Sequence, residues 1–250
     1  MHTVKNKKVL IIGGSGLIGK RTSLDLIKNG AIVINIDLVD NVKKKKNYKF
    51  HKIDCTNKDF FKNVSEKVLK SFSPDVIVNC SYPKTDDWVK NDFKNFNVLS
   101  FTKNTEYHFN SYFLFTKKIA DYMKKKKING SIILLSSIYG FLGQNQFLYS
   151  GTGKSENLTY SIIKGSLINF VRQMCAYYAR YNIRVNCISP GGIEDKKMSK
   201  KFKIKYSKIC PSKRLGKPEE VSSAILYLAS TSSSYINGSN LIIDGGFSSI

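Results

Sequence analysis

Apolar runs rich in β-branched residues recur along the chain, and segments with helical periodicity lie between most of them. The runs are Lys8–Ile12, Ala31–Asp37, Asn47–Ile53, Asp75–Cys80, Gly130–Ser136, Ile183–Ser189 and Ser239–Ile243. The helical segments are Gly19–Asn29, Asp59–Ser71, Phe101–Lys126, Tyr160–Tyr181 and Pro218–Ser230. Strands that alternate with helices indicate βαβ units. We therefore predict one α/β domain over residues 1–250, a doubly wound Rossmann-like domain with about seven strands, mostly parallel, and helices on both faces.

The composition excludes several classes of protein. The chain has 250 residues and an apolar fraction of 42%, which suits a globular protein. No stretch approaches the roughly 18 apolar residues of a membrane span, and the apolar run Val9–Ile12 is too short for a signal peptide. We expect a cytoplasmic protein. The odd number of cysteines, without a Cys-x-x-Cys pair or metal-ligand spacing, indicates reduced thiols and no metal site.

The formal net charge of +23 would suit a protein that binds nucleic acid or a membrane surface. The lysines are scattered, however, apart from the runs Lys43–Lys46 and Lys124–Lys127. We therefore interpret the charge as a general surface property and expect no nucleic-acid or membrane partner. A basic field that attracts an anionic substrate stays open as an alternative.

The first apolar run leads directly into the glycine-rich segment Gly13-Gly14-Ser15-Gly16-Leu17-Ile18-Gly19. Gly14, Gly16 and Gly19 fit Gly-x-Gly-x-x-Gly, and Gly13, Gly16 and Gly19 fit Gly-x-x-Gly-x-x-Gly equally well. Glycines permit a tight turn and a close backbone approach, and the following helix offers N–H groups to a pyrophosphate. Because the segment follows a strand and precedes a helix, it predicts dinucleotide binding.

Two aspartates end the next two strands. Asp37 can accept hydrogen bonds from the adenosine ribose and would repel a 2′-phosphate, which favours NAD(H) over NADP(H). The nearby run Lys43–Lys46 leaves NADP(H) open. Asp54 is placed to contact the adenine ring, or it forms a simple Asp turn.

Tyr160 and Lys164 lie four residues apart at the start of a predicted helix and so share one face. A lysine ammonium there would lower the tyrosine pKa and make the phenol a general acid or base. This spacing alone is weak evidence, because a lysine-rich chain with 14 tyrosines will contain it by chance.

Taken in order, the segments "IIGGSGLIG", "HKIDCT", "DVIVNCSY", "GSIILLSSIYG", Tyr160-Ser-Ile-Ile-Lys164, "IRVNCISPGG" and "LIIDGG" resemble the short-chain dehydrogenases/reductases over nearly the whole chain. The resemblance implies that Tyr160 is the catalytic acid/base, that Lys164 holds the nicotinamide ribose, and that Ser137 binds the substrate oxygen. It places Asn79 near the ribose, with Pro190 and Gly191 beside the nicotinamide. The other cofactor neighbours it implies are Ser15, Leu17, Ile18, Cys55, Cys80, Ser81 and Ile193.

The chain departs from the family pattern in places. The family's Asn-Asn-Ala-Gly is Asn79-Cys80-Ser81-Tyr82 here. His108 stands where the family has a relay asparagine, with Asn110 two residues later. An imidazole can donate and accept protons, so His108 is a candidate catalytic relay group or a packed helix residue.

A finer resemblance is to a bacterial branch associated with flagellin modification and surface-glycan sugars of the legionaminic type. It implies a sugar substrate that is free, phosphorylated or nucleotide-linked. The long segment Phe141–Thr159 would lie over the active site, and the basic part of Ile193–Lys217 (Lys196–Lys208, Lys213 and Arg214) would suit an anion. Candidate substrate contacts are Tyr82, Lys84, Asp86, Trp88 and Tyr139; Trp88 would stack on a sugar or fill a core.

Two alternatives share the dinucleotide motifs. One is a keto reductase of fatty-acid or polyol metabolism. The other is an NAD-binding sensor or scaffold without turnover, against which the set Ser137, Tyr160 and Lys164 argues. Family members assemble through the helices near Phe101–Lys126 and Tyr160–Tyr181, so we expect a homodimer or homotetramer.

Overall fold

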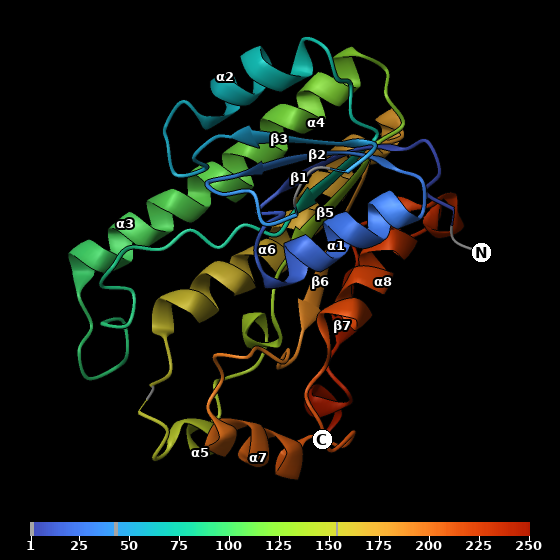
Figure 1. Ribbon diagram of the computed structural model, residues 1–250. Helices are drawn as coiled ribbons and strands as arrows, with labels where there is room; N and C mark the ends of the chain where they lie inside the picture. The colour runs from blue at the N-terminus through green and yellow to red at the C-terminus, as the bar shows by residue number, and fades with distance from the viewer. Residues whose placement is uncertain (1–2, 43–44, 154) are drawn as a thin grey trace.

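Seven parallel strands form one sheet in the computed structural model, which describes residues 3–42, 45–153 and 155–250 (Figure 1). The strand order is β3-β2-β1-β4-β5-β6-β7. The strands are β1 (Lys8–Ile12), β2 (Ile32–Asp37), β3 (Tyr48–Lys52), β4 (Val76–Asn79), β5 (Ser131–Leu135), β6 (Arg184–Pro190) and β7 (Asn240–Ile243). This order confirms the predicted doubly wound Rossmann-like fold, and the sheet is entirely parallel rather than mostly so.

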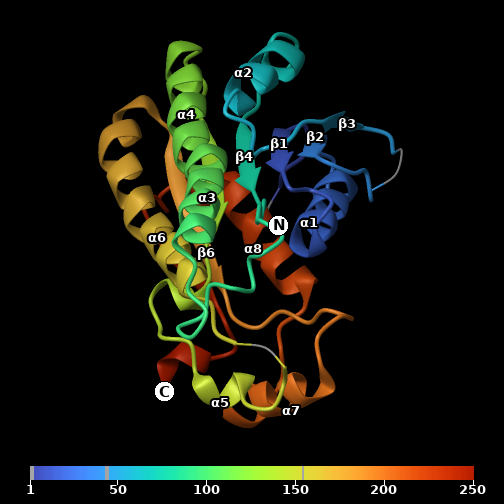
Figure 2. The same cartoon turned by 90° about the vertical axis from the view of Figure 1, so that its left-hand side faces the viewer.

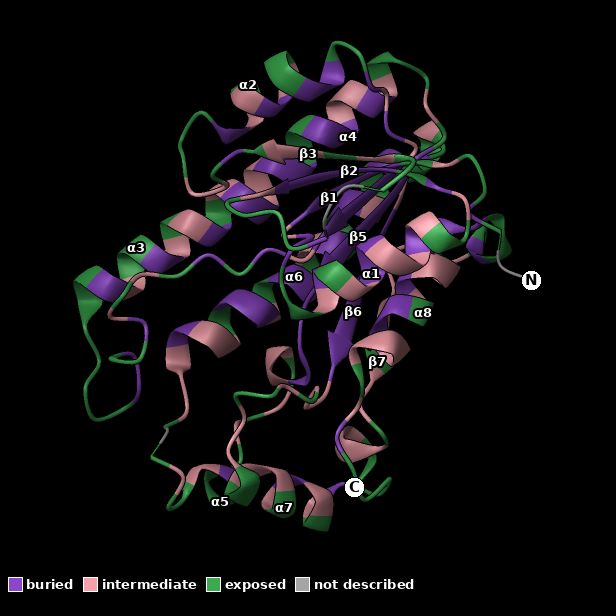
Figure 3. Cartoon of the chain, viewed as in Figure 1, coloured by how far each residue is buried: buried purple, intermediate pink, exposed green. Residues whose placement is uncertain are grey.

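Helices cover both faces of the sheet (Figure 2). One face carries α1 (Leu17–Lys28) and α8 (Pro218–Ala229). The other carries α2 (Phe60–Val64), α4 (Phe115–Lys125) and α6 (Leu158–Tyr178). Alternate residues of each strand point to opposite faces, so β1 contributes Leu10 and Ile12 to one core and Val9 and Ile11 to the other. The central strands are therefore buried on both faces, as Figure 3 shows, whereas the edge strands β3 and β7 are only partly buried.

The long helix predicted at Phe101–Lys126 is a composite rod. It consists of α3 (Val98–His108), a π-helical segment (Phe109–Leu114) and α4. A second π-helical segment, Ser65–Leu69, continues α2. The first π segment faces the end of β4, where the Asn79 amide donates to the Ser111 carbonyl at 2.7 Å. π-helical turns occur frequently at functional sites, and in this one the Tyr112 ring lies 5.1 Å from the Lys164 ammonium.

Two helices of the structure are not among the helical segments predicted from the sequence. α5 (Gln146–Tyr149) lies within Phe141–Thr159, and α7 (Lys200–Ile209) lies within Ile193–Lys217. Ser199 caps α7 by accepting from the Phe202 N–H at 3.2 Å. In α7 the apolar residues at helical spacing, Phe202, Tyr206 and Ile209, were obscured by the lysines between them.

Helices α5 and α7, here called the lid, pack on each other below the carboxyl ends of the strands (Figure 1). They share a small apolar cluster of Leu148, Tyr206, Cys210 and Leu215, separate from the two main cores. The Tyr206 ring stacks on Phe247 at 4.9 Å, which joins the lid to the C-terminal segment. None of the described helices is long and apolar enough to cross a membrane.

Candidate active site

The glycine-rich segment forms the turn between β1 and α1. Gly13 has φ +75°, and a Cβ there would lie 2.7 Å from the Ser81 backbone. A Cβ on Gly19 would collide with the Gly13 carbonyl. The α1 N-cap is Gly16, and no side chain caps this end, so the first N–H groups of α1 are available to a ligand. These features fit a dinucleotide pyrophosphate, which needs close backbone approach and N–H donors.

A cleft of about 790 Å³ extends from this turn along the ends of β1, β2 and β3. It lies where the strand order reverses, the usual ligand position in such sheets. Most residues predicted to bind the cofactor line it: Gly13, Ser15, Gly16, Leu17, Ile18, Gly19, Asp37, Asp54, Cys55, Cys80 and Ser81. The sequence interpretation and the geometry therefore agree on where a dinucleotide would lie.

The carboxylate of Asp37 ties the second strand to the glycine turn. It accepts from the backbone N–H groups of Ser15 at 2.9 Å and Leu38 at 2.7 Å. The Ser15 hydroxyl donates to the Val39 carbonyl at 2.6 Å and accepts from the buried Asn35 amide at 3.0 Å. A carboxylate has about four acceptor positions, so Asp37 keeps capacity for ribose hydroxyls.

Two further parts of the cofactor prediction can be placed. Asp54 forms an Asp turn, because its Oδ1 accepts from both the N–H and the hydroxyl of Thr56 at 2.8 Å, and it also borders the cleft. In the run Lys43–Lys46, residues 43 and 44 lie outside the described residues, and Lys45 and Lys46 are exposed and do not line the cleft.

A second pocket, of about 530 Å³, adjoins the cofactor cleft. The two share Leu17, Ile18, Cys80, Ser81 and Tyr82 in their walls. The pocket gathers the remaining predicted residues from the ends of β5 and β6 and from α6: Ser137, Tyr139, Tyr160, Lys164, Pro190, Gly191 and Ile193. These predicted residues, up to 56 positions apart in the chain, thus line a single pocket beside the dinucleotide cleft.

Close packing between β5 and α6 fixes the central residues. The Ser136 hydroxyl donates to the Lys164 carbonyl at 2.7 Å, and a Cβ on Gly140 would come within 2.7 Å of the same oxygen. Ser137 accepts from the Tyr139 N–H at 3.2 Å, and its hydroxyl interacts with that of Tyr160. The strand end therefore presents the Ser137 hydroxyl to Tyr160.

Lys164 does not lower the pKa of Tyr160 in this arrangement, contrary to our expectation. Burial raises the pKa of Tyr160, and the bond from Ser137 offsets part of this effect. The Lys164 ammonium donates to the Leu135 carbonyl at 2.7 Å and lies 5.9 Å from the Tyr160 ring centroid. Burial also lowers the pKa of Lys164 to about 8. Desolvation is thus the largest influence on the pKa of both Tyr160 and Lys164.

Asn79, predicted to lie near the cofactor ribose, is fully buried and lines neither cavity. Its Oδ1 accepts from the N–H of Ser81 at 3.1 Å and from the Ser81 hydroxyl at 2.7 Å. Ser81, in contrast, lines both cavities. Asn79 therefore joins the end of β4 to the π-helical segment and orients the turn that carries Ser81.

His108 is packed inside the protein rather than exposed to the pocket. It is 1% exposed, and neither ring nitrogen has a hydrogen-bond partner among the described residues. Burial, and then the charge of Lys164, lowers its pKa to about 3. Its ring lies 6.0 Å from Tyr82 and 5.8 Å from Tyr112. This placement favours the packing interpretation, with a neutral imidazole near Lys164.

The candidate substrate residues that follow β4 lie in different environments. Tyr82 lies between the two cavities, with its ring 5.8 Å from that of Tyr160 in an edge-on arrangement. Lys84 lines the cofactor cleft rather than the substrate pocket. Trp88 is 8% exposed and packs against Tyr82 and His108, so it fills a core. Asp86 is exposed and lines neither cavity.

Sequence reasoning flagged two segments over the site but not the individual residues that line the pocket. These are Gln144, Tyr149, Ser155, Asn157, Asp195, Met198, Phe202 and Tyr206. Four come from the segment before Tyr160 and four from the segment that contains α7. The spacing of Met198, Phe202 and Tyr206, four residues apart, is a helical signal that could have identified their shared face.

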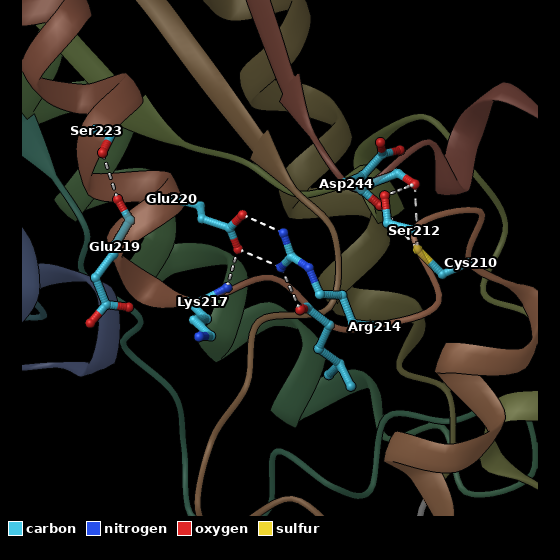
Figure 4. A network of polar contacts seen from close by, with 10 residues as sticks. Cys210, Ser212, Arg214, Lys217, Glu219, Glu220, Ser223 and Asp244 are labelled. Atoms are coloured by element: carbon cyan, nitrogen blue, oxygen red, sulfur yellow. Dashed lines mark hydrogen bonds and ion pairs between the residues drawn. The ribbon is translucent and has the colours of Figure 1, made fainter.

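The basic residues of the α7 segment do not line the pocket. Lys203 pairs with Glu194 at 2.8 Å. Arg214 pairs with both carboxylate oxygens of Glu220 at the start of α8 (Figure 4). Lys164 is the one lysine or arginine among the described lining residues, and Lys154 lies outside the described part. The expected anion-binding surface is therefore absent from the described walls.

The described residues hold no group of histidine, cysteine, aspartate and glutamate side chains suited to a metal ion. The five cysteines, two of them buried, are all free thiols in the structure. The arrangement instead combines a hydroxyl pair, a buried ammonium and a dinucleotide cleft, which suits hydride transfer with proton exchange.

Comparison with known proteins agrees with this geometry. The family model described as enoyl-(acyl carrier protein) reductase matches residues 15–248. A post-translational flagellin modification protein A from Campylobacter coli is 28% identical, with 98% of this chain and 99% of that protein covered. A 3-oxoacyl-(acyl carrier protein) reductase from Thermotoga maritima is 32% identical, with coverages of 97% and 98%.

A solved structure extends the comparison to the cofactor. The short-chain dehydrogenase from Leptospira borgpetersenii, with bound NAD⁺, superposes with a TM-score of 0.87 at 30% identity, covering 98% of this chain and 94% of that one. Sequence match, strand order and cofactor cleft lead to the same assignment. The chain belongs to the short-chain dehydrogenase/reductase family and is an NAD(P)-dependent oxidoreductase.

Proposed function

We propose that the protein transfers a hydride between NAD(H) and a hydroxyl-bearing or carbonyl carbon of a sugar derivative, with Tyr160 as the acid/base. The observation that carries the proposal is the meeting of Ser137, Tyr160 and Lys164 in a pocket that shares a wall with the dinucleotide cleft. The bound dinucleotide would supply or accept the hydride at its nicotinamide ring.

The roles of the chain's own residues follow from their contacts. The Ser137 hydroxyl interacts with that of Tyr160 in the same pocket, so the two hydroxyls can bind one substrate oxygen between them. In reduction, Tyr160 would donate its proton to that oxygen; in oxidation, it would take the proton. The raised pKa of Tyr160 keeps the phenol protonated at neutral pH, which suits the proton-donating direction.

Lys164 would hold the nicotinamide ribose. Its ammonium is buried at the junction of the pocket with α6 and donates a hydrogen bond to the Leu135 carbonyl. Pro190 and Gly191 would border the nicotinamide from the end of β6. A relay through His108 would need water, because its imidazole has no hydrogen bond to Ser137, Tyr160 or Lys164.

NAD(H) is the preferred cofactor in this proposal. Asp37 presents a carboxylate to the cleft where the adenosine ribose would lie, and Ser15 holds the following loop against the glycine turn. At this position the Asp37 carboxylate would repel a 2′-phosphate. Lys84 is the one lysine among the described residues that line the cleft.

A sugar derivative suits the walls of the substrate pocket. Polar side chains (Ser155, Asn157 and Asp195) lie there together with aromatic rings (Tyr82, Tyr139, Tyr149, Phe202 and Tyr206). Hydroxyl groups need such hydrogen-bond partners, and the apolar face of a sugar ring packs well on aromatic rings. The Campylobacter relative, named for flagellin modification, supports a place in surface-glycan biosynthesis.

A keto reductase acting on an acyl thioester is the second candidate. The Thermotoga relative supports it at 32% identity, and the pocket also has apolar walls at Ile138, Ile193 and Met198. A direct test compares two assays: oxidation of a panel of free, phosphorylated and nucleotide-linked sugars with NAD⁺, and reduction of acetoacetyl thioesters with NADH. Turnover confined to thioesters would contradict the sugar proposal, and no turnover in either assay would favour the scaffold alternative.

We also propose assembly as a homodimer or homotetramer through α3, α4 and α6. The support is apolar surface on these helices: Phe109 is 53% exposed and Ile162 is 46% exposed. Light scattering of the purified protein would measure the mass in solution, and a monomer at micromolar concentration would contradict the proposal.

A further inference from the structure

We propose that Gln144 is a positioning residue for Tyr160, because it connects the lid to the first turn of the helix that carries the catalytic tyrosine. The inference rests on the proposed role of Tyr160 in the reaction. It assigns Gln144 a part in catalysis without contact to the reacting atoms. Side chains in the wall of the substrate pocket would then connect the pocket to Tyr160.

The Gln144 carboxamide makes four hydrogen bonds. Its Nε2 donates to the Asn157 carbonyl at 2.7 Å and to the Ser161 hydroxyl at 2.8 Å. Its Oε1 accepts from the Tyr149 hydroxyl at 2.9 Å and from the Asn157 N–H at 3.2 Å. An amide has two donors and about two acceptor positions, so this side chain is saturated. A carboxylate could not donate to Asn157 and Ser161.

Asn157 carries the connection to Tyr160. It is the N-cap of α6, and its Oδ1 accepts from the Tyr160 N–H at 2.8 Å. Its Nδ2 donates to the Trp88 carbonyl at 2.8 Å. The N-cap side chain sets how the chain enters a helix. The backbone of Tyr160 is therefore held by Asn157, and Asn157 is held on both its N–H and its carbonyl by Gln144.

The lid side of the connection begins at Tyr149, the last residue of α5. Its ring lies 6.2 Å from that of Phe202 in α7, and its hydroxyl interacts with that of Tyr139. Phe202 and Tyr139 both line the substrate pocket. A substrate that contacts these rings would shift Tyr149, and Gln144 would pass this shift to the first turn of α6.

The test uses three variants of the full-length protein in complex with NADH. Gln144→Met keeps the length of the side chain and removes all four hydrogen bonds. Tyr149→Phe removes only the hydrogen bond that the Tyr149 hydroxyl donates to Gln144. Gln146→Met is the matched control, because Gln146 is exposed in α5 and its side chain has no hydrogen bond to a described residue. The readouts are amide hydrogen exchange of residues 157–163, the affinity for NADH, and kcat with its pH profile.

We expect faster exchange at residues 157–163 in Gln144→Met and in Tyr149→Phe, with NADH affinity unchanged. We expect kcat to fall about 10-fold or more in Gln144→Met, with a shifted pH profile, and less in Tyr149→Phe. Gln146→Met should match the parent protein in every readout.

Two results would overturn the inference. If Tyr149→Phe changes neither exchange at residues 157–163 nor kcat by more than twofold, the lid is not coupled to Tyr160. If Gln144→Met weakens NADH binding as much as it lowers kcat, the role is merely structural. Failure of the parent protein to turn over any panel compound would contradict the proposed function instead, and the exchange measurement would still decide the coupling.

Discussion

The cofactor cleft and the substrate pocket share a wall but are built differently. The cleft is formed by residues that directly follow β1 to β4, and short bonds such as Ser15 N–H to Asp37 fix its turns. The outer wall of the pocket comes from α5 and α7, which have a small apolar cluster of their own. The difference teaches that the cofactor cleft, which can serve many reactions, is formed by the strand ends of the sheet. The wall that selects the substrate is formed by segments that lie outside the sheet.

The largest effect that would separate the two regions is expected from Tyr160→Phe. The variant keeps the ring and loses the exchangeable proton, so we expect turnover to fall about 10³-fold. NADH affinity should change less than about twofold, because the glycine turn and Asp37 are untouched. Steady-state rates and a fluorescence titration of NADH measure the two quantities. Retained turnover would mean that another group exchanges the proton.

On the cofactor side, Asp37→Ser should lower the preference for NADH over NADPH by about 10- to 100-fold, since hydrogen bonds to a charged group contribute about 1.5–3 kcal/mol. Asp40→Ser is the matched control: Asp40 lies in the same loop and accepts from Tyr48, outside the cleft. The ratio of the two dissociation constants is the measurement. An unchanged ratio in Asp37→Ser would show that the loop, and not the carboxylate, selects the cofactor.

At the junction of the two regions, Lys164→Met should stabilise the protein while it abolishes turnover. Burial lowers the pKa of Lys164 from 10.5 to about 8, so the unfolded chain binds more protons between these pH values. The cost of the buried ammonium is fully present below pH 8, falls as the pH rises through this window, and is absent above 10.5. A shift of this size corresponds to about 3 kcal/mol.

The methionine variant also loses the bond to the Leu135 carbonyl, which costs about 1 kcal/mol. We therefore expect the free energy of unfolding to rise by about 2 kcal/mol at pH 7, with no gain above pH 10.5. Urea unfolding at both pH values gives the difference. A variant less stable than the parent at pH 7 would contradict the burial argument.

The smallest effect is expected from the basic residues of the lid. Changing Lys203, Lys208 and Lys213 to alanine should alter KM for the sugar substrate less than about twofold, because none of them lines the described pocket. A KM that rises tenfold, and that falls back for an uncharged substrate, would restore the anion-binding interpretation.

The sequence predicted the sheet well because buried parallel strands are continuous apolar runs, such as Val76–Asn79, that few other structures allow. The glycine turn and Asp37 were equally predictable, since each follows a strand directly. Helix α7 was missed because six of its ten residues are lysine or serine, which hid Phe202 and Tyr206.

The site was less predictable where the environment of a residue decides its role. The spacing of Tyr160 and Lys164 suggested a lowered tyrosine pKa, but burial reverses the direction in the structure. Asn79 ends a strand in the expected position, yet its amide points toward Ser111. Desolvation and side-chain direction depend on tertiary packing, which motif spacing does not contain.

The most direct test of the account is a titration of the purified protein with NADH and, separately, with NADPH, followed by nicotinamide fluorescence. The account predicts saturable binding of both, with NADH at least 10-fold tighter because of Asp37. Tighter binding of NADPH would contradict the assignment of Asp37 as the selective residue. Absence of binding to either would contradict the preformed cofactor cleft on which the proposed reaction depends.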